Sequence, residues 1–220
     1  MSFQVAEKFV SINGEGRRAG ELAAFIRFSG CNLRCAWCDT LWALDEPPKE
    51  ELTADEIIRW VKDTGVKNVT LTGGEPMLQK GIRELLVRLS GDAGLRVEVE
   101  TNGAVDLTPF YGISERISYT VDYKCPGSGM EGRMLGRNFE RIREWDTVKF
   151  VVTDHHDLER MFEVIGRYRL TETSKVYVSP VFGRIDPKEI AEELIGRGMN
   201  DVRLQLQLHK LIWNPEERGV

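Results

Sequence analysis

The sequence lacks the features that mark membrane-spanning and secreted proteins. It has no stretch of about 18 consecutive apolar residues, which is what a helix needs to cross a bilayer. The first eight residues contain no apolar segment of the kind found in signal peptides. Only four cysteines are present, and three of them lie in one short stretch, which is not the pattern of a disulfide framework. We therefore expect a protein of the reducing cytoplasm.

The chain also lacks a strong excess of either charge. Its 30 lysines and arginines and 35 aspartates and glutamates give a net charge of −5, which leaves no electrostatic footprint for nucleic acid. No repeat, low-complexity tract or linker divides the sequence. With 41% hydrophobic and 30% charged residues, a chain of 220 residues suits one globular domain that spans residues 1–220.

What the sequence does have is a group of cysteines with an informative spacing. Cys31, Cys35 and Cys38 follow the pattern C-x3-C-x2-C, with Trp37 directly before the last cysteine. Cubane iron–sulfur clusters are normally held by four cysteine thiolates, so three thiolates leave one iron without a protein ligand. An open metal position distinguishes catalytic from structural zinc sites, and by the same logic it indicates a place where a small molecule reacts.

A different class of protein, a non-catalytic module that holds zinc, is the alternative. Zinc sites usually combine two C-x2-C units, or one such unit with two histidines. Here there is one C-x2-C pair, and its potential partners Cys125, His155, His156 and His209 are scattered along the chain. The spacing therefore favours a cluster over zinc, and Cys125 is expected to be a small buried hydrophobic residue.

Short β-rich runs alternate with helical patterns along most of the chain. Strands are expected at 24–28, 69–72, 96–100, 117–121, 148–152, 176–178 and 202–208. Helices are expected at 54–64, 79–89, 157–168 and from 187 onward. Thr53 and Glu56 form a capping box, and Asp186 caps a helix that begins with Pro187. The alternation predicts βαβ units and a parallel sheet, with no long helix between 102 and 147.

Polar residues occupy every second position in three of these expected strands. They are Thr70 and Thr72; Arg96, Glu98 and Glu100; and Arg203, Gln205, Gln207 and His209. Buried parallel strands are normally apolar on both faces. An edge strand facing solvent would explain one polar face, whereas three require a common polar interior. We therefore predict an α/β fold, a partial and open (β/α) barrel, with ligands at the carboxyl ends of its strands.

Two of the expected strands end in motifs that can be interpreted together with the cysteine loop. Gly73-Gly74-Glu75-Pro76 and Glu100-Thr101-Asn102, together with the cysteine spacing, resemble motifs of the radical S-adenosylmethionine (SAM) superfamily. The resemblance implies a [4Fe-4S] cluster on the three cysteines, whose open iron binds SAM. An electron from the reduced cluster then cleaves SAM to methionine and a 5′-deoxyadenosyl radical.

The resemblance also implies a set of SAM contacts. Asp122-Tyr123-Lys124 stands where many members have Ser-Pro-Lys, so only the lysine matches the superfamily there. The implied SAM-binding residues are Trp37, Cys38, Asp39, Gly73, Gly74, Glu75, Glu100, Thr101, Asp122, Tyr123 and Lys124.

Further segments are similar to one family, the 7-carboxy-7-deazaguanine synthases. They are Phe9–Gly16, Ala24–Phe28, Cys38–Thr40, Lys124–Met130, Val148–Val152 and Gln205–Lys210. The resemblance implies a homodimer built on a reduced (β/α)6 barrel. The implied reaction converts 6-carboxy-5,6,7,8-tetrahydropterin to 7-carboxy-7-deazaguanine with loss of ammonia, on the route to queuosine-type bases.

The same resemblance implies further ligands and partners. Thr40 would bind Mg²⁺, and an electron donor such as flavodoxin or ferredoxin would reduce the cluster. Arg27 is independently suited to a carboxylate because its planar fork lies in an otherwise apolar strand. His209 has the alternative role of a core histidine. The implied substrate-binding residues are Ile12, Asn13, Gly14, Glu15, Arg27, Thr72, Gln207 and His209.

The alternative within this superfamily is another small enzyme, such as an activase that installs a glycyl radical on a partner protein. Activases share the cysteine spacing. They lack the Asn-Gly-Glu-Gly segment at 13–16 and the Gln-x-Gln-x-His ending at 205–209 that this chain carries.

Overall fold

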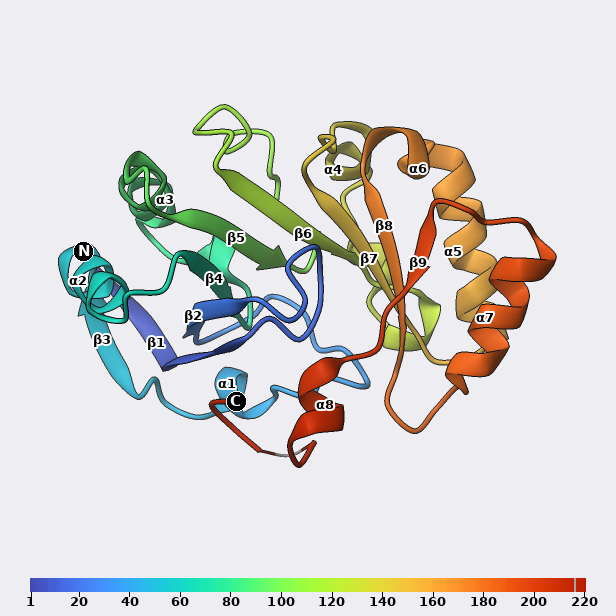
Figure 1. The fold of residues 1–220 in the computed structure, drawn as a ribbon, viewed down its shortest axis with the longest axis horizontal. Coiled ribbons are helices and arrows are strands. Elements are labelled where there is room, and N and C mark those ends of the chain that lie inside the picture. The colour runs from blue at the N-terminus through green and yellow to red at the C-terminus, as the bar shows by residue number, and fades with distance from the viewer. Residues whose placement is uncertain (216) are drawn as a thin grey trace.

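The computed structural model describes residues 1–215 and 217–220, and within these residues nine strands form one curved sheet (Figure 1). The strand order is β3-β1-β2-β4-β5-β6-β7-β8-β9, and the terminal strands β3 and β9 do not pair with each other. The sheet is therefore a partial barrel that is not closed, as predicted. Its strands are β1 (Ser2–Ile12), β2 (Leu22–Phe28), β3 (Glu50–Thr53), β4 (Asn68–Gly73), β5 (Arg96–Thr101), β6 (Ile117–Tyr123), β7 (Thr147–Val152), β8 (Lys175–Pro180) and β9 (Val202–Leu204).

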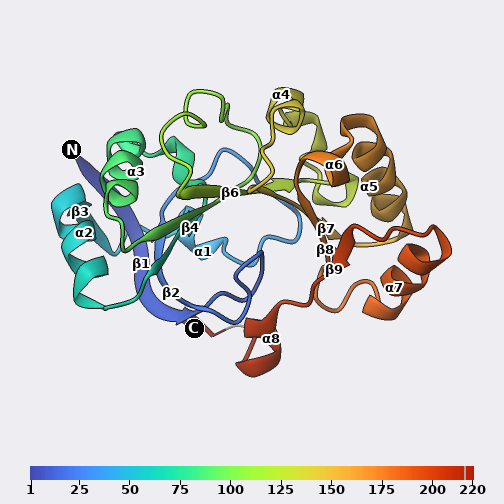
Figure 2. The ribbon, with the colours of Figure 1, turned by 45° about the horizontal axis from the view of Figure 1, so that its top comes forward.

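The longer helices lie outside the curve of the strands, and the short helix α8 lies at its open side (Figure 2). From β2 to β9 neighbouring strands are parallel, whereas β1 is antiparallel to β2 and β3. The helices are α1 (Trp42–Asp45), α2 (Ala54–Asp63), α3 (Ile82–Gly91), α4 (Gly136–Glu140), α5 (His155–Tyr168), α6 (Leu170–Thr173), α7 (Pro187–Gly196) and α8 (Leu208–Ile212), with 3₁₀ turns η1 (Pro76–Leu78), η2 (Pro126–Ser128) and η3 (Glu131–Arg133).

The two faces of the sheet have opposite chemistry, as the alternation of polar residues predicted. The outward side chains form the hydrophobic core with the helices, and they include Ile26, Leu71, Val99, Val121, Phe150 and Val178. The inward side chains are mostly polar and stand next to one another across the strands: Arg27 beside Thr72, Thr70 beside Glu98, Glu100 beside Thr120, and Asp122 beside Lys149.

The helix starts follow the predicted capping residues. The Thr53 backbone N–H donates to the Glu56 carboxylate at 2.7 Å, and the Glu56 N–H donates to the Thr53 hydroxyl at 3.3 Å, which completes the capping box of α2. Asp186 accepts from the backbone of Lys188 at the start of α7. Each cap satisfies backbone donors that the first helical turn leaves without partners.

Two parts of the fold differ from the sequence prediction. Strands β1 and β3 were not expected, and β1 pairs with both β2 and β3. The strand predicted at 202–208 ends at Leu204, so Gln205 and Gln207 lie beyond it and His209 is in α8. The chain leaves the sheet because the Gln205 side chain bonds both backbone groups of Gly16, at 2.7 and 3.1 Å.

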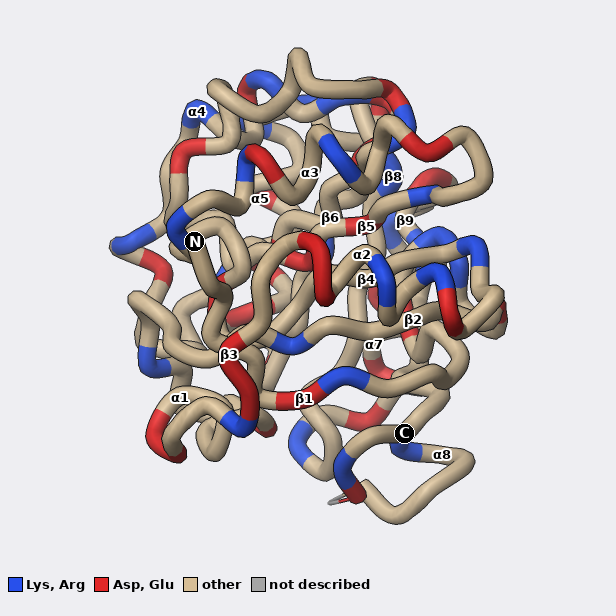
Figure 3. Tube along the Cα trace, turned by 90° about the vertical axis from the view of Figure 1, so that its left-hand side faces the viewer, with Lys and Arg blue, Asp and Glu red and all other residues tan. Residues whose placement is uncertain are grey.

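Charge is dispersed over the side of the molecule that carries β1 and β3, where acidic and basic residues are interspersed along the trace (Figure 3). Among the described residues, no helix is both long enough and apolar enough to span a bilayer.

Candidate active site

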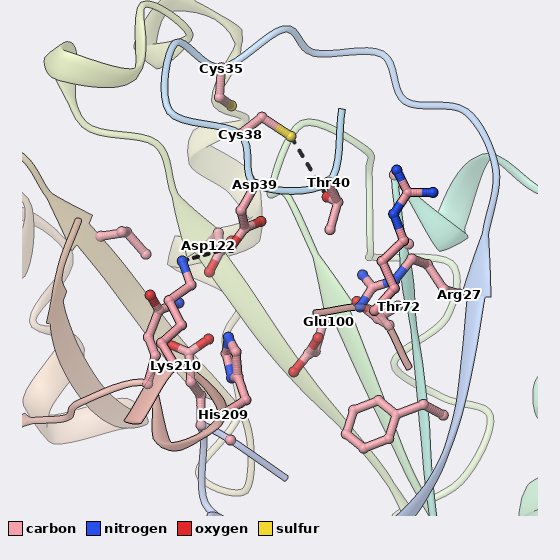
Figure 4. A pocket seen from close by; sticks show the side chains of 18 of the residues that line it. Arg27, Cys35, Cys38, Asp39, Thr40, Thr72, Glu100, Asp122, His209 and Lys210 are labelled. Carbon is pink, nitrogen blue, oxygen red and sulfur yellow. Dashed lines mark hydrogen bonds and ion pairs between the residues drawn. The ribbon is translucent and has the colours of Figure 1, made fainter. Parts of the chain in front are cut away.

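A cavity of about 340 Å³ lies on the concave side of the sheet, where the parallel strands end (Figure 4). This volume falls in the range of small-molecule sites. The cavity brings together residues that are up to about two hundred positions apart in the sequence. The predicted residues that line it are Ile12, Gly14, Glu15, Arg27, Cys31, Cys35, Trp37, Cys38, Asp39, Thr40, Thr72, Gly73, Gly74, Glu100, Thr101, Asp122, Lys124, Gln207 and His209.

The cysteine loop connects β2 to α1 and borders the cavity. All three of its cysteines are free thiols and partly buried. The Cys31 sulfur accepts hydrogen bonds from the Leu33 N–H and from the Asn102 side chain, each at 3.4 Å. The loop is also held at its centre, where the Ala36 N–H donates to the Ser128 carbonyl at 3.0 Å. These contacts fix a loop that has no regular secondary structure around its first two cysteines.

The donor set fits a cluster with one open position. Cys125, the remaining cysteine, is completely buried and does not line the cavity, so the described residues offer only three sulfurs there. Within the described part of the chain, no three His, Cys, Asp or Glu side chains converge closely enough to hold a single metal ion. Such convergence is what zinc requires, whereas each thiolate of a cubane binds a different iron. The geometry gives no support to the zinc alternative.

Gly73 and Gly74 are required by close backbone packing. A Cβ atom on Gly74 would lie 2.0 Å from the Gly30 carbonyl oxygen, directly before the first cysteine. A Cβ atom on Gly73 would lie 2.3 Å from the Phe28 carbonyl, and Gly73 has φ +141°. The Gly74 and Glu75 N–H groups donate to the carbonyls of Phe28 and Gly30 at 3.0 and 2.8 Å. The glycines therefore seat the cysteine loop against the end of β4.

The carboxylate of Glu75 is completely buried and does not line the cavity. It accepts hydrogen bonds from the Met77 N–H, the Thr101 hydroxyl and the Asn102 N–H, at 2.9, 2.8 and 2.7 Å. Burial raises the pKa of Glu75 to about 7, although these three bonds oppose the shift. The side chain thus joins the ends of β4 and β5, and Glu75 does not line the cavity.

Tyr123 and Asn13 also lie outside the cavity lining. The Tyr123 hydroxyl donates to Glu131 at 2.7 Å, and its ring packs against Phe139 on the outer face of the sheet. Tyr123 follows Asp122 in an extended strand, so the two side chains face opposite sides. Asn13 is buried and its side-chain oxygen accepts from the Thr70 hydroxyl at 2.9 Å.

A network of paired charges forms the floor of the cavity. Lys124 bonds Asp122 at 2.7 Å, and Lys149 lies 3.0 Å from Glu15 and 3.6 Å from Asp122. Burial alone would raise the pKa of Asp122, but Lys124 and Lys149 outweigh burial and hold the pKa below its ordinary value. Asp122 is therefore charged at neutral pH.

The cation of Lys124 extends this network toward the cysteine loop. Its ammonium lies over the ring of Trp37, 5.0 Å from the ring centroid, which is a cation–π distance. Burial would lower the pKa of Lys124, but Asp122 outweighs burial and the pKa is raised. A positive group is thus fixed beside the thiols, on the side of the cavity that the sequence assigned to SAM.

The segment after β9 completes the cavity on its open side. The Leu208 N–H donates to the Gly14 carbonyl at 3.1 Å, and a Cβ atom on Gly14 would lie 2.3 Å from His209. Lys210 forms an ion pair with Asp39 in the cysteine loop at 3.0 Å. Burial lowers the pKa of His209, so its imidazole is neutral at pH 7.

Several residues in the cavity were not singled out from the sequence. Lys149 had an available signal, because a lone charge in the apolar run of β7 is as unusual as Arg27 in β2. Lys210 and Glu7 had none, since each acquires its role from an ion pair with a residue far away in the sequence. Arg218 stacks on Trp42, 4.2 Å from the ring centroid, and likewise could not have been found.

Comparison with known proteins supports the chemistry of this site. The family model described as the radical SAM superfamily matches residues 25–116. The 7-carboxy-7-deazaguanine synthase of Clostridium acetobutylicum is 52% identical over the full length of both chains. The synthase of Leptospira interrogans is 35% identical, and the match covers 98% of this chain and 97% of that protein.

Solved structures agree in fold. The crystal structure of QueE from Escherichia coli matches with a TM-score of 0.68 and 24% identity, over 94% of each chain. Streptococcus suis SuiB bound to the precursor peptide SuiA matches with a TM-score of 0.58 and 15% identity, over 80% of this chain and 46% of that one. The glycyl-radical activase alternative is not favoured, because the full-length relatives described above are synthases. The chain belongs to the 7-carboxy-7-deazaguanine synthase family of radical SAM enzymes, a family whose chemistry implies a [4Fe-4S] cluster and SAM.

Proposed function

We propose that the chain converts 6-carboxy-5,6,7,8-tetrahydropterin to 7-carboxy-7-deazaguanine with loss of ammonia. The observation that carries this proposal is the joining of three free thiols and the guanidinium of Arg27 in one cavity. The thiols suit a cluster with an open iron, and the guanidinium suits a substrate that bears a carboxylate. Identity of 52% over the whole length of a curated synthase supports the same reaction.

When bound, the cluster and SAM would supply the radical chemistry by which a hydrogen atom is removed from the substrate. The chain's own residues would bind and orient the reactants. We assign the cluster to Cys31, Cys35 and Cys38. The proposed SAM contacts are the side chains of Trp37, Asp39, Glu100, Thr101, Asp122 and Lys124 and the backbone of Gly73, Gly74 and Glu75. The proposed substrate contacts are Ile12, Gly14, Glu15, Arg27, Thr72, Gln207 and His209.

A Mg²⁺ site at Thr40 is a further part of the proposal. The Thr40 hydroxyl lies 3.7 Å from the Cys38 sulfur, and the residue lines the cavity next to Asp39. One hydroxyl, with water and a substrate carboxylate, is a suitable oxygen set for a small octahedral cation. Thr40→Ala should therefore weaken the stimulation of turnover by Mg²⁺ while iron content stays unchanged. Thr173→Ala, at an exposed helix end, is the matched control; an unaltered Mg²⁺ response in Thr40→Ala would reject Thr40 as a ligand.

An anaerobic assay tests the proposed reaction directly. The reconstituted protein is incubated with reductant, SAM and carboxytetrahydropterin, and the products are analysed by mass spectrometry. We expect 7-carboxy-7-deazaguanine and an equal amount of ammonia. An intact cluster that cleaves SAM without forming the deazaguanine acid would refute the proposal.

We further propose a homodimer that receives electrons from flavodoxin or ferredoxin in the cytoplasm. The basis is family membership, together with a cysteine content that fits a reducing compartment. Light scattering on the purified protein should give twice the 25.1 kDa chain mass. A monomer at micromolar concentration would contradict the dimer.

A further inference from the structure

Strand β1 contains one residue more than the part of β2 with which it pairs. Val5 stands opposite Phe28, and Glu7 stands opposite Arg27, so two steps along β1 match a single step along β2. Ala6 is the extra residue. This is the arrangement of a β-bulge, which bends a strand and re-aims the side chains that follow it.

The bulge changes the face on which the odd-numbered residues of β1 lie. Without it, alternate residues would keep to one side of the sheet. Before the bulge, Phe3 and Val5 are buried in the hydrophobic core. After it, Glu7 and Phe9 line the cavity. The bulge therefore transfers a carboxylate from the core side of the sheet to the cavity side, at the position opposite Arg27.

Glu7 and Arg27 form a close and largely buried ion pair. The Arg27 Nε donates to the Glu7 carboxylate at 2.8 Å, and the two side chains are only 18% and 13% exposed. Within the described residues, the two terminal nitrogens of Arg27 have no hydrogen-bond partner. The guanidinium lies 6.0 Å from the ring centroid of Trp42, and Figure 4 shows it beside Thr72 and Glu100.

We propose that Glu7 is a positioning residue that aims the terminal edge of the Arg27 guanidinium at the substrate carboxylate. A guanidinium binds a carboxylate through a pair of parallel N–H groups. Glu7 occupies Nε, so the pair that is left for a ligand is the one formed by the two terminal nitrogens. The inference rests on the proposed function, in which Arg27 holds the carboxylate of the pterin.

Binding of two ligands that differ only in a carboxylate tests this role. The probes are pterin-6-carboxylate and unsubstituted pterin, and their affinities for the reconstituted protein are measured by calorimetry. Glu7→Ala should weaken binding of the carboxylate about tenfold, which is the usual effect of losing one hydrogen bond to a charged group, and leave pterin binding unchanged. Glu7→Gln keeps an acceptor for Nε and should retain most of the affinity, which also covers the case in which Glu7→Ala does not fold.

Lys8→Ala is the control variant on the same strand. Lys8 has its own cross-strand ion pair, with Glu50, and does not line the cavity. It should alter neither affinity. Equal loss of both probes in Glu7→Ala would indicate a structural role and overturn the proposal.

A double-mutant cycle shows whether Glu7 acts through Arg27. Arg27→Ala should by itself abolish the preference for the carboxylate, and adding Glu7→Ala should cause no further loss. Losses that add in the double variant would overturn the proposal.

The proposed reaction and the positioning role of Glu7 can be refuted separately. If binding of the carboxylate depends on Glu7 but the wild type forms no deazaguanine acid, only the proposed reaction is refuted. A wild type that forms the product, with affinity independent of Glu7, refutes only the positioning role.

Discussion

Successive residues of β5 serve two different purposes. Val97 and Val99 point into the core under the helices, whereas Glu98 and Glu100 point into the interior of the barrel. Burial raises the pKa of Glu98 to about 7 and also raises that of Glu100. The outer face of the strand gains stability from burial, while the inner face keeps polar groups in an unfavourable environment.

Folding and chemistry are thus divided between the two faces of one sheet. The outer face is a continuous apolar surface, and the inner face collects the groups that meet ligands. Substitutions on the outer face should therefore change stability and spare the site, while inner substitutions should change titration and binding. The two requirements meet at the end of β4, where Gly73 and Gly74 pack closely against the backbone of Phe28 and Gly30, directly before the cysteine loop.

Gly74→Ala should have the largest effect, because it disturbs both faces at once. The new methyl group would overlap the Gly30 carbonyl, and backbone cannot move away as a side chain can. We expect a loss of at least about 3 kcal/mol in the free energy of unfolding, together with low iron content after reconstitution. Urea unfolding and iron analysis are the measurements.

Gly91→Ala is the matched control for this substitution. Gly91 is the last residue of α3, and a Cβ atom there would meet nothing within 4 Å. The variant should be unchanged or more stable by up to about 1 kcal/mol, with normal iron content. If Gly74→Ala behaved like Gly91→Ala, the close packing of the cysteine loop would be refuted.

Leu71→Ala tests the outer face alone. Leu71 is completely buried in β4, two residues before Gly73, and does not line the cavity. Loss of its side chain should cost about 2–5 kcal/mol of unfolding free energy through the cavity that it leaves. The substrate KM of the folded fraction should stay the same. Val87→Ala, at a half-exposed position of α3, should change stability by less than about 0.5 kcal/mol. A raised KM in Leu71→Ala would contradict the assignment of stability to the outer face and of ligand binding to the inner face.

Glu98→Gln tests the inner face through pH. The Glu98 carboxyl accepts from the Thr120 hydroxyl at 2.6 Å, and its other oxygen has no partner within the described residues. Since its pKa is about 7 in the folded protein and ordinary in the unfolded chain, the folded state holds the proton more tightly. Stability should therefore fall as pH rises from about 4.5 to about 7, by up to about 3 kcal/mol.

Glu98→Gln cannot lose that proton and should remove this part of the pH dependence. Unfolding in urea at pH 5 and pH 8 measures how the free energy of unfolding depends on pH. If the free energy of unfolding changed equally between pH 5 and pH 8 in wild type and variant, Glu98 would not be the cause of the pH dependence. The comparison with Thr53→Ala, which removes a cap on α2 far from the barrel interior, controls for a general loss of stability.

The fold was predictable where periodicity and capping agree. Strands β2 and β4 to β8 and helices α2, α5 and α7 follow from apolar runs and their caps. β1 was missed because its bulge at Ala6 breaks the alternation on which a strand prediction depends. β9 was predicted too long because its alternation extends beyond the strand. The alternation of polar residues continues past Leu204, but the Gln205 side chain binds the Gly16 backbone, and the chain leaves the sheet.

The site was predictable to the extent that its residues lie in local motifs. The cysteine loop, Arg27 and the residues at the strand ends do meet in one cavity. The direction of a side chain within a motif was not predictable, as Glu75 shows, because its partners Thr101 and Asn102 come from another strand. Lys210 and Glu7 depend on contacts between distant segments, which no local pattern contains.

The contact between Gly74 and Gly30 has an evolutionary consequence. Any side chain at position 74 would force the segment before the first cysteine onto a different path, because its Cβ atom would lie 2.0 Å from the Gly30 carbonyl oxygen and 3.0 Å from the Cβ atom of Cys31. We therefore expect the double glycine and the length of the loop to be inherited as a unit. Among relatives, a change in one should be accompanied by a change in the other, and lineages that vary only one of them should have lost the cluster.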